Sequence, residues 1–334
     1  MNKSDGERIA SVLEKRGYKP AEKLETADLI VVNMCSIRQS AVHRIFGLAL
    51  KFKQLKNKNP KLKTVLTGCV LKSDKNKFKE RFDEIWENKT HWNINPICQN
   101  NQTLFVPISN GCDNFCTYCA VPYTRGRLIC RGHKDILKEI KTALTRPCLV
   151  KADKVEIWLL GQNVNDYQSP TDKSINFAKL LKMANNTPGS FQIRFMSPNP
   201  KNFSDELIEV MAKCKKVAKY LNLPVQSGDN KILKTMNRPY TAQQYKILVK
   251  KIRKAIPDIN LSTDVIVGFP GETKKQFENT AKLFKEIKFD IAYISKYSPR
   301  PGTVAFKMKD NVPMKEKKRR EKILAKLTKH NVHN

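Results

Sequence analysis

The regular alternation of short apolar runs with helical segments constrains this chain most. Six runs with strand character lie at residues 104–108, 155–160, 191–196, 220–223, 261–267 and 291–297. Helical periodicity lies between them at residues 135–145, 177–185, 204–213, 242–255 and 274–288. Six strand-then-helix units without internal hairpins predict a parallel sheet curled into a full or partial barrel, with its chemistry at the carboxyl ends of the strands.

The first part of the chain predicts a second, smaller α/β unit. A helix is expected at residues 4–15, and strands at 29–32 and 64–67, with a Lys-rich helical segment between the strands. Each strand runs into a cysteine, Cys35 or Cys69, at the position where α/β sheets place ligands. We expect an N-terminal domain over 1–95 that ends in a polar linker at 88–101, a barrel over 98–312 and a basic C-terminal helix within 313–334.

The net charge indicates a polyanionic partner without proving one. The chain has 63 Lys and Arg against 31 Asp and Glu, a formal charge of +32, and 40% apolar residues are enough for a globular core. The positive electric field of such a chain attracts nucleic acid. The surplus of positive residues is mostly Lys spread along the chain, so a general Lys-rich bias of the genome stays open as the alternative explanation. No apolar run approaches a membrane span, and the start lacks a signal peptide, so we expect a cytoplasmic protein.

Three cysteines after the first barrel strand form the most informative motif. Cys112, Cys116 and Cys119 follow the spacing Cys-x3-Cys-x2-Cys, which turns three thiols toward one point. Three thiolates on a four-iron cluster leave one iron open to substrate. A structural zinc ion needs four ligands, whereas Cys130 is too distant and His133 stands alone. The motif favours an iron–sulfur cluster with an open iron, as in radical S-adenosylmethionine enzymes, over zinc or plain core thiols.

Further motifs lie at the predicted strand ends around the barrel mouth. Their glycines let backbone groups approach a nucleoside, although each turn alone is as well explained by loop geometry. The residues expected to contact a nucleoside cofactor are Gln162, Asn163, Gln226, Ser227, Gly268, Gly271 and Glu272. Tyr123, Arg125 and Arg127 follow the cysteines and are candidates for contacts with substrate phosphate or base, with a solvated basic loop as the alternative.

Several motifs together carry a family resemblance. They are Asn33-Met34-Cys35-Ser36-Ile37-Arg38, Thr67-Gly68-Cys69, residues 112–127, 160–165 (LGQNVN), 223–228 (LPVQSG), 267–273 (VGFPGET) and 297–303 (YSPRPGT). With these motifs the chain resembles the methylthiotransferase family of radical S-adenosylmethionine enzymes. Ser36-Ile37-Arg38 favours the MiaB-type branch, the tRNA-2-methylthio-N6-dimethylallyladenosine synthases.

The resemblance implies a fold, cofactors and a reaction. The fold is a small parallel α/β domain followed by a partial (β/α)6 barrel. Cys112, Cys116 and Cys119 would hold the 4Fe-4S cluster that reductively cleaves S-adenosylmethionine, and Cys35 and Cys69 would bind a conditional auxiliary 4Fe-4S cluster. A 5′-deoxyadenosyl radical abstracts hydrogen from adenine C2 of prenylated tRNA before methylthiolation. No side chain is expected to act as acid or base, because the cofactor carries the chemistry.

The resemblance also implies partners and differences from relatives. We expect tRNA, an electron donor such as a flavodoxin or ferredoxin, and a monomer. Relatives have a third auxiliary cysteine before the segment that here begins at Met1, and a TRAM domain after the basic helix, so we expect this sequence to be short at both ends. Cys98 is a weak candidate for the third ligand, and Cys130, Cys148 and Cys214 are expected to be ordinary thiols.

Two alternative functions stay open from the sequence. One is methylthiolation of another substrate, either threonylcarbamoyladenosine in tRNA or a ribosomal protein. The other is a non-catalytic tRNA-binding remnant with an incomplete auxiliary cluster, since the positive charge would persist without catalysis. In each RNA-binding case we expect the basic helix at 315–326 and the loop with Arg125 and Arg127 to contact the RNA.

Overall fold

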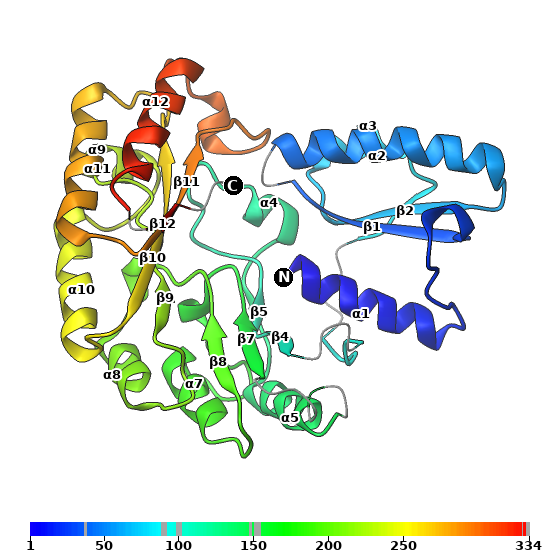
Figure 1. Cartoon of the computed structure of the whole chain (residues 1–334), viewed down its shortest axis with the longest axis horizontal. Helices are drawn as coiled ribbons and strands as arrows, with labels where there is room; N and C mark the ends of the chain where they lie inside the picture. Colours follow the sequence, from blue (N-terminus) through cyan, green and yellow to red (C-terminus); the bar gives the residue numbers. More distant parts are fainter. Residues whose placement is uncertain are drawn as a thin grey trace.

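The computed structural model describes residues 1–36, 39–87, 92–97, 102–146, 149, 155–328 and 330–331. Figure 1 shows a small sheet with its helices beside a larger curved sheet whose convex face carries most of the other helices. Ile37 and Arg38 of the branch motif, Cys98, Cys148 and much of the predicted linker lie outside the described residues.

The small unit is a parallel sheet in the order β1 (Leu29–Cys35), β2 (Lys63–Cys69) and β3 (Glu84–Ile85). Three helices accompany it: α1 (Asn2–Lys15), α2 (Gln39–Lys58) and α3 (Lys72–Lys79). A separate apolar core that includes Met34, Phe52, Leu66 and Phe78 holds this sheet to its helices. The register places Cys35 directly opposite Cys69, so the sheet brings the two predicted cysteines together.

The larger unit contains all six predicted strands. They are β4 (Thr103–Pro107), β7 (Glu156–Leu160), β8 (Gln192–Phe195), β9 (Tyr220–Asn222), β10 (Asn260–Val267) and β11 (Ile291–Lys296). Every neighbouring pair in the orders β4-β7-β8 and β9-β10-β11 is parallel. Ile193 of β8 joins the two sheets through the segment that precedes β9. Its N–H donates to Lys216 O (2.7 Å), and its C=O accepts from Ala218 N (2.9 Å). The result is the predicted partial barrel.

The predicted helices pack on the outer face of this sheet (Figure 1). They are α5 (His133–Leu144), α7 (Phe177–Asn185), α8 (Asp205–Lys213), α10 (Ala242–Ala255) and α11 (Lys274–Ile287), with a short α9 (Asn230–Thr235) added. Their starts follow from capping: Ser204 accepts from Leu207 N, and Thr241 and Thr273 each form a capping box with a glutamine. Their apolar faces share one core with the strands.

The prediction of units without hairpins is wrong in the first loop. There β5 (Ser109–Asn110) and β6 (Ile129–Cys130) pair antiparallel, and the short helix α4 (Val121–Arg125) lies between them. Two-residue strands carry too little apolar pattern to be read from sequence. This hairpin closes the loop that holds the cysteine motif.

The basic helix lies where the sequence analysis expects it, and a short strand follows it. α12 (Met314–Ala325) is followed by β12 (His330–Asn331), which pairs parallel with β11. Lys317 and Arg320 of this helix are buried and bind Asp310 (2.6 Å) and Glu272 (2.6 Å). These two cations therefore fasten the helix to the barrel and do not face solvent as RNA contacts would.

Candidate active site

The cysteine motif lies on the loop between β5 and α4. Cys112 N donates to Gly126 O (3.2 Å), and Cys119 N donates to Cys116 O (2.9 Å). Gly111 has a φ of +77°, and a Cβ there would lie 2.0 Å from Arg127 O. Only glycine allows the loop to close this tightly against the strand that returns from it.

A second segment, which the sequence analysis did not single out, holds the same loop from the other side. The turn after α9 provides Met236 and Asn237: Met236 O accepts from Thr117 N (3.1 Å), and Asn237 Nδ2 donates to Asn114 O (3.0 Å) and Phe115 O (3.1 Å). Asn237 has a φ of +56°, a conformation in which asparagine is enriched. In the sequence, the asparagine of Met236-Asn237-Arg238-Pro239 was the signal from which this turn could have been predicted.

The three thiols of the motif are free and partly buried. Burial raises the pKa of the Cys112 thiol above its usual value and that of Cys119 to about 12. Both are therefore protonated at neutral pH unless a metal displaces the proton, as metal ligation of a thiol does. The loop is thus a set of ligands that becomes ionised on metal binding.

The type of donor group at this loop bears on the metal that it can hold. Across the ranges that the structure describes, no three His, Cys, Asp or Glu side chains lie close enough to share one metal ion. A structural zinc site needs such convergence, whereas cysteines that hold a 4Fe-4S cluster each bind a different iron. Three free cysteine thiols on one loop are the donor set of such a cluster.

Unpartnered polar atoms gather at the adjacent strand end. Ser109 Oγ, Gln162 Oε1 and Asn163 Oδ1 are buried, and each lacks a hydrogen-bond partner among the described residues. Asp166 ties this end of β7 to the cysteine loop, because it accepts from Asn163 Nδ2 and from Asn114 Nδ2 (3.1 Å). A buried polar atom without a partner costs about 1–3 kcal/mol. These atoms fit a polar ligand bound beside the loop.

A cavity of about 500 Å³ opens at the mouth of the barrel. It is bounded by β10, β11, α12 and the start of α2, and residues from separate motifs line it, including Tyr118, Gln226, Asp264, Arg300 and Gln39. Gln226 sits there with a φ of +68°. The cavity therefore connects the cysteine loop with the small N-terminal unit.

Other predicted cofactor residues lie in the barrel wall. Ser227 is fully buried and lies 3.4 Å from the hydroxyl of Thr280. The Glu272 carboxylate accepts from Gly268 N (2.7 Å) and pairs with Arg320, and Gly268 has no room for a Cβ beside Lys317. Gly271 has a φ of +81° and open space around it. The 268–272 turn is thus shaped by its own carboxylate and by α12.

Arg125 occupies a different place from the one predicted. Its side chain is 2% exposed, and it donates to Cys69 Sγ (3.0 Å), Asp5 (2.7 Å), Asn2 (2.7 Å) and Asn110 (2.9 Å). Figure 1 shows α4, which carries Arg125, between the barrel and the small sheet. In this structure Arg125 connects the cysteine loop to the end of β2 and to α1, and it does not reach open substrate space.

Tyr123 and Arg127 remain at the surface beside the loop. Tyr123 is 42% exposed and meets the Phe115 ring edge-on, with 6.5 Å between ring centroids. The Arg127 side chain is 71% exposed, lies 5.1 Å from the centre of the Phe115 ring and pairs with Asp113 (2.9 Å). Both are accessible to a large partner.

Cys35 and Cys69, the predicted auxiliary ligands, lie at the contact between the two units. Burial raises the pKa of the Cys69 thiol, and the nearby Arg125 guanidinium opposes that rise. The contact is fixed by buried ion pairs, Arg8 with Glu139 (2.5 Å) and Arg300 with Asp74 (3.3 Å). Because these pairs are largely shielded from water, they hold the end of the small sheet near the barrel mouth.

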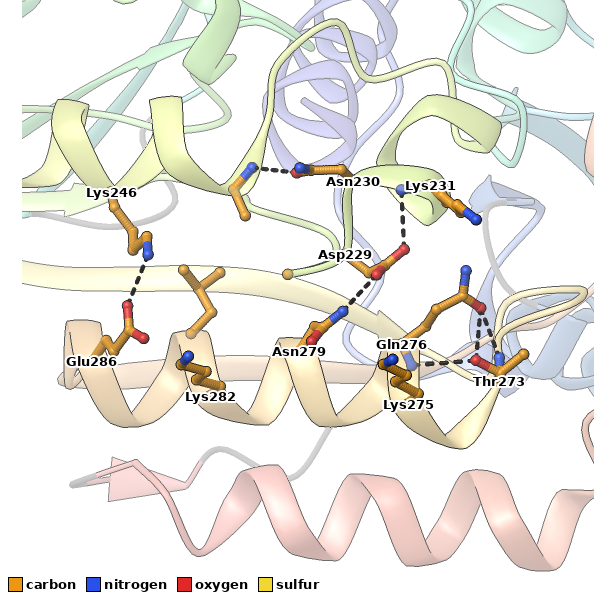
Figure 2. Close-up of a pocket in the computed structure, with 13 residues that line it drawn as sticks. Asp229, Asn230, Lys231, Lys246, Thr273, Lys275, Gln276, Asn279, Lys282 and Glu286 are labelled. Carbon is orange, nitrogen blue, oxygen red and sulfur yellow. Dashed lines mark hydrogen bonds and ion pairs between the residues drawn. The ribbon is translucent and has the colours of Figure 1, made fainter.

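A larger groove, of about 640 Å³, lies outside the barrel between α9, α10 and α11. Figure 2 shows its lysines, Lys231, Lys275 and Lys282, around the side chains of Asp229 and Asn279, which bond each other at 2.7 Å. Its lining contains none of the predicted cofactor residues, whereas Gln226, and Tyr118 of the cysteine loop, line the barrel-mouth cavity. The barrel-mouth cavity, although smaller, is therefore the candidate active site.

Two family models match the chain. The model described as the radical SAM superfamily matches residues 106–284, and the model described as uncharacterized protein family UPF0004 matches residues 1–86. None of the helices in the described ranges has both the length and the apolar character needed to span a membrane.

Named relatives match most of the chain. A tRNA-2-methylthio-N(6)-dimethylallyladenosine synthase of Clostridium botulinum strain Langeland is 40% identical, and the match covers 96% of this chain and 77% of the relative. A protein of the same name from Thermoanaerobacter sp. strain X514 is 42% identical, over 93% of this chain and 72% of the relative.

Solved structures support the fold. The radical S-adenosylmethionine methyltransferase TsrM from Kitasatospora setae, solved with tryptophan and a cofactor analogue, gives a TM-score of 0.58 at 12% identity, over 90% of this chain and 66% of that one. The cobalamin-dependent S-adenosylmethionine radical enzyme OxsB gives 0.57 at 13% identity, over 90% and 46%. The predicted radical SAM fold is confirmed, and the chain belongs to the radical SAM superfamily and, within it, to the family of tRNA-2-methylthio-N(6)-dimethylallyladenosine synthases.

Proposed function

We propose that this enzyme is a tRNA methylthiotransferase that adds a methylthio group to C2 of N6-dimethylallyladenosine beside the anticodon. The observation that carries the proposal is the cysteine loop, closed by the β5–β6 hairpin next to buried polar atoms without partners, in a chain of this family. An aromatic C–H bond offers no handle for an acid or base, which agrees with a site built of cluster ligands and amides.

Cys112, Cys116 and Cys119 would hold a 4Fe-4S cluster, which when bound supplies the electron for reductive cleavage of S-adenosylmethionine. Ser109, Gln162 and Asn163 present the polar atoms that lack partners, and we assign them to contacts with that cofactor. Gln226 lines the barrel-mouth cavity, together with Tyr118 of the cysteine loop. Ser227, Gly268, Gly271 and Glu272 contribute by shaping the rim backbone, since Glu272 fixes Gly268 N.

Cys35 and Cys69 would be ligands of a second, auxiliary 4Fe-4S cluster. Their place opposite each other at the ends of β1 and β2 supports this assignment. Arg300 also lies near this point, since it bonds Gln39 of α2 at 2.5 Å and lines the cavity. The auxiliary cysteines and the S-adenosylmethionine site would thus serve one reaction space.

The RNA contacts proposed here are those that the structure leaves exposed. Tyr123 and Arg127 would meet the anticodon stem-loop near the cluster, with long-range attraction from the charge of +32. We further propose a flavodoxin or ferredoxin as electron donor, a monomeric cytoplasmic enzyme, and the domain division 1–95, 98–312 and 313–334.

Mass spectrometry of tRNA nucleosides from a deletion strain tests this function. Complementation with the wild-type chain should restore the methylthio group on prenylated adenosine, and Cys116→Ala should leave the prenylated adenosine without it. Loss of methylthiolation from threonylcarbamoyladenosine or from a ribosomal protein instead would move the proposal to another substrate. Binding of tRNA without any methylthiolated product would favour a non-catalytic remnant.

A further inference from the structure

Arg238 lies in the turn that is hydrogen-bonded to the cysteine loop, directly after Met236 and Asn237. Its Nη1 donates to Cys116 Sγ at 3.5 Å, its Nε to the Tyr240 hydroxyl at 2.9 Å and its Nη2 to Pro224 O at 3.2 Å. All three guanidinium nitrogens are engaged, so the direction of the bond toward the sulfur is fixed. The residue is only 8% exposed.

Arg238 differs from the other buried cations of the chain. Six further Arg and Lys residues of the described ranges are buried, and each has a carboxylate partner: Arg8, Arg125, Arg131, Arg300, Lys317 and Arg320. Arg238 forms no ion pair with any Asp or Glu in that part of the chain. Its hydrogen-bond partners are a phenol, a carbonyl and a thiol.

A buried cation without a counter-charge is destabilising, because burial removes its hydration. The nearest source of negative charge is the set of cysteines, which become thiolates when they bind iron. The guanidinium that has no carboxylate is thus also the one whose N–H points at Cys116. Charge and geometry indicate the same partner, an anionic group held at Cys116.

We propose that Arg238 is a positioning residue for the cluster, which donates a hydrogen bond to the Cys116 sulfur and balances the charge of the bound thiolates. The inference rests on the proposed function, because it needs a cluster at Cys112, Cys116 and Cys119. Hydrogen bonds to cluster sulfurs and nearby charge set the reduction potential. A fixed cation stabilises the reduced, more negative cluster, so its removal makes the cluster harder to reduce.

The test is a redox titration of the anaerobically reconstituted full chain, followed by electron paramagnetic resonance, with iron counted on the same samples. Arg238→Gln should lower the midpoint potential by about 59 mV, a tenfold change in the equilibrium constant for one-electron reduction. Arg238→Lys should give a smaller shift. The matched control is Arg253→Gln, since Arg253 donates to Ile287 O and Lys288 O and bonds none of the cysteines that the structure describes; its potential should equal that of the wild type.

A wild-type potential in Arg238→Gln with full iron content would overturn the inference. If Arg238→Gln fails to fold, Tyr240→Phe removes only the hydroxyl that orients Nε, and it must shift the potential in the same direction; an unchanged value there also overturns the inference. Absence of any cluster in the wild-type chain is a different result, because it would overturn the proposed function itself.

Discussion

Gly111→Ala tests how tightly the cysteine loop must close. A Cβ at this position would lie 2.0 Å from Arg127 O, so that carbonyl has to move by about 1 Å to reach an acceptable contact. The movement strains the hydrogen bond from Cys112 N to Gly126 O and that from Leu128 N to Asp113. Each is worth about 1 kcal/mol, and alanine at positive φ adds about 1–2 kcal/mol. We expect a loss of about 2–4 kcal/mol in the free energy of unfolding.

Gly302→Ala is the matched control. Gly302 has a φ of +86°, close to the +77° of Gly111, but nothing lies within 4 Å of its added Cβ. It should therefore lose only the conformational part, about 1–2 kcal/mol. The assays are urea unfolding of the metal-free chain followed by circular dichroism, and iron content after reconstitution. Equal destabilisation of the two variants, with full iron in Gly111→Ala, would refute the packing argument for this loop.

Three further results are expected. Arg320→Met should lower the free energy of unfolding by about 3–5 kcal/mol, because it leaves the buried Glu272 carboxylate without its ion-pair partner. Glu272→Gln should lower it less, because Arg320 keeps its second ion pair with Glu316; a double variant that is no more stable than Arg320→Met would contradict this. Hydrogen bonds from Arg319 lower the pKa of the Glu316 carboxyl to about 2 from an ordinary 4.5, so its contribution to stability is full above about pH 4.5 and lost as the pH falls toward 2. Glu316→Gln should abolish that part of the acid dependence in unfolding curves recorded from pH 6 to 2, and an unchanged profile would show that the pairing is unimportant. Arg127→Ala should weaken tRNA binding and reduce the slope of log affinity against log salt by about 1; a wild-type slope would remove Arg127 from the RNA contact.

The barrel was predictable because its strands are long and apolar enough to show their period, and the structure contains all six strands proposed from the sequence. The motif Cys112, Cys116 and Cys119 was equally visible, since ligand spacing is local in sequence. Side-chain direction was not visible. Arg125 follows the motif among basic and aromatic residues and was taken as a substrate contact, yet its guanidinium turns inward to Cys69 and Asp5.

Long-range partners explain the other differences. Asp166 and Arg238 lie 50 or more residues from Cys112 and Cys116, and only the fold brings them to the loop. Likewise, Lys317 looks like a solvated lysine in a basic helix, because its packing on Gly268 joins residues that are far apart in sequence. Local chemistry was readable from the sequence, but the second set of contacts around it required the tertiary structure.

Formation of 5′-deoxyadenosine from S-adenosylmethionine tests the central claim most directly. The reconstituted, chemically reduced chain should produce it under anaerobic conditions, and so should Cys214→Ala, whose thiol is part of the apolar core of the larger unit. Cys112→Ala, Cys116→Ala and Cys119→Ala should each abolish it. A wild-type chain that binds about four irons and yet forms no 5′-deoxyadenosine, or a Cys116→Ala chain that forms as much as the wild type, would contradict the assignment of this loop as the radical S-adenosylmethionine site.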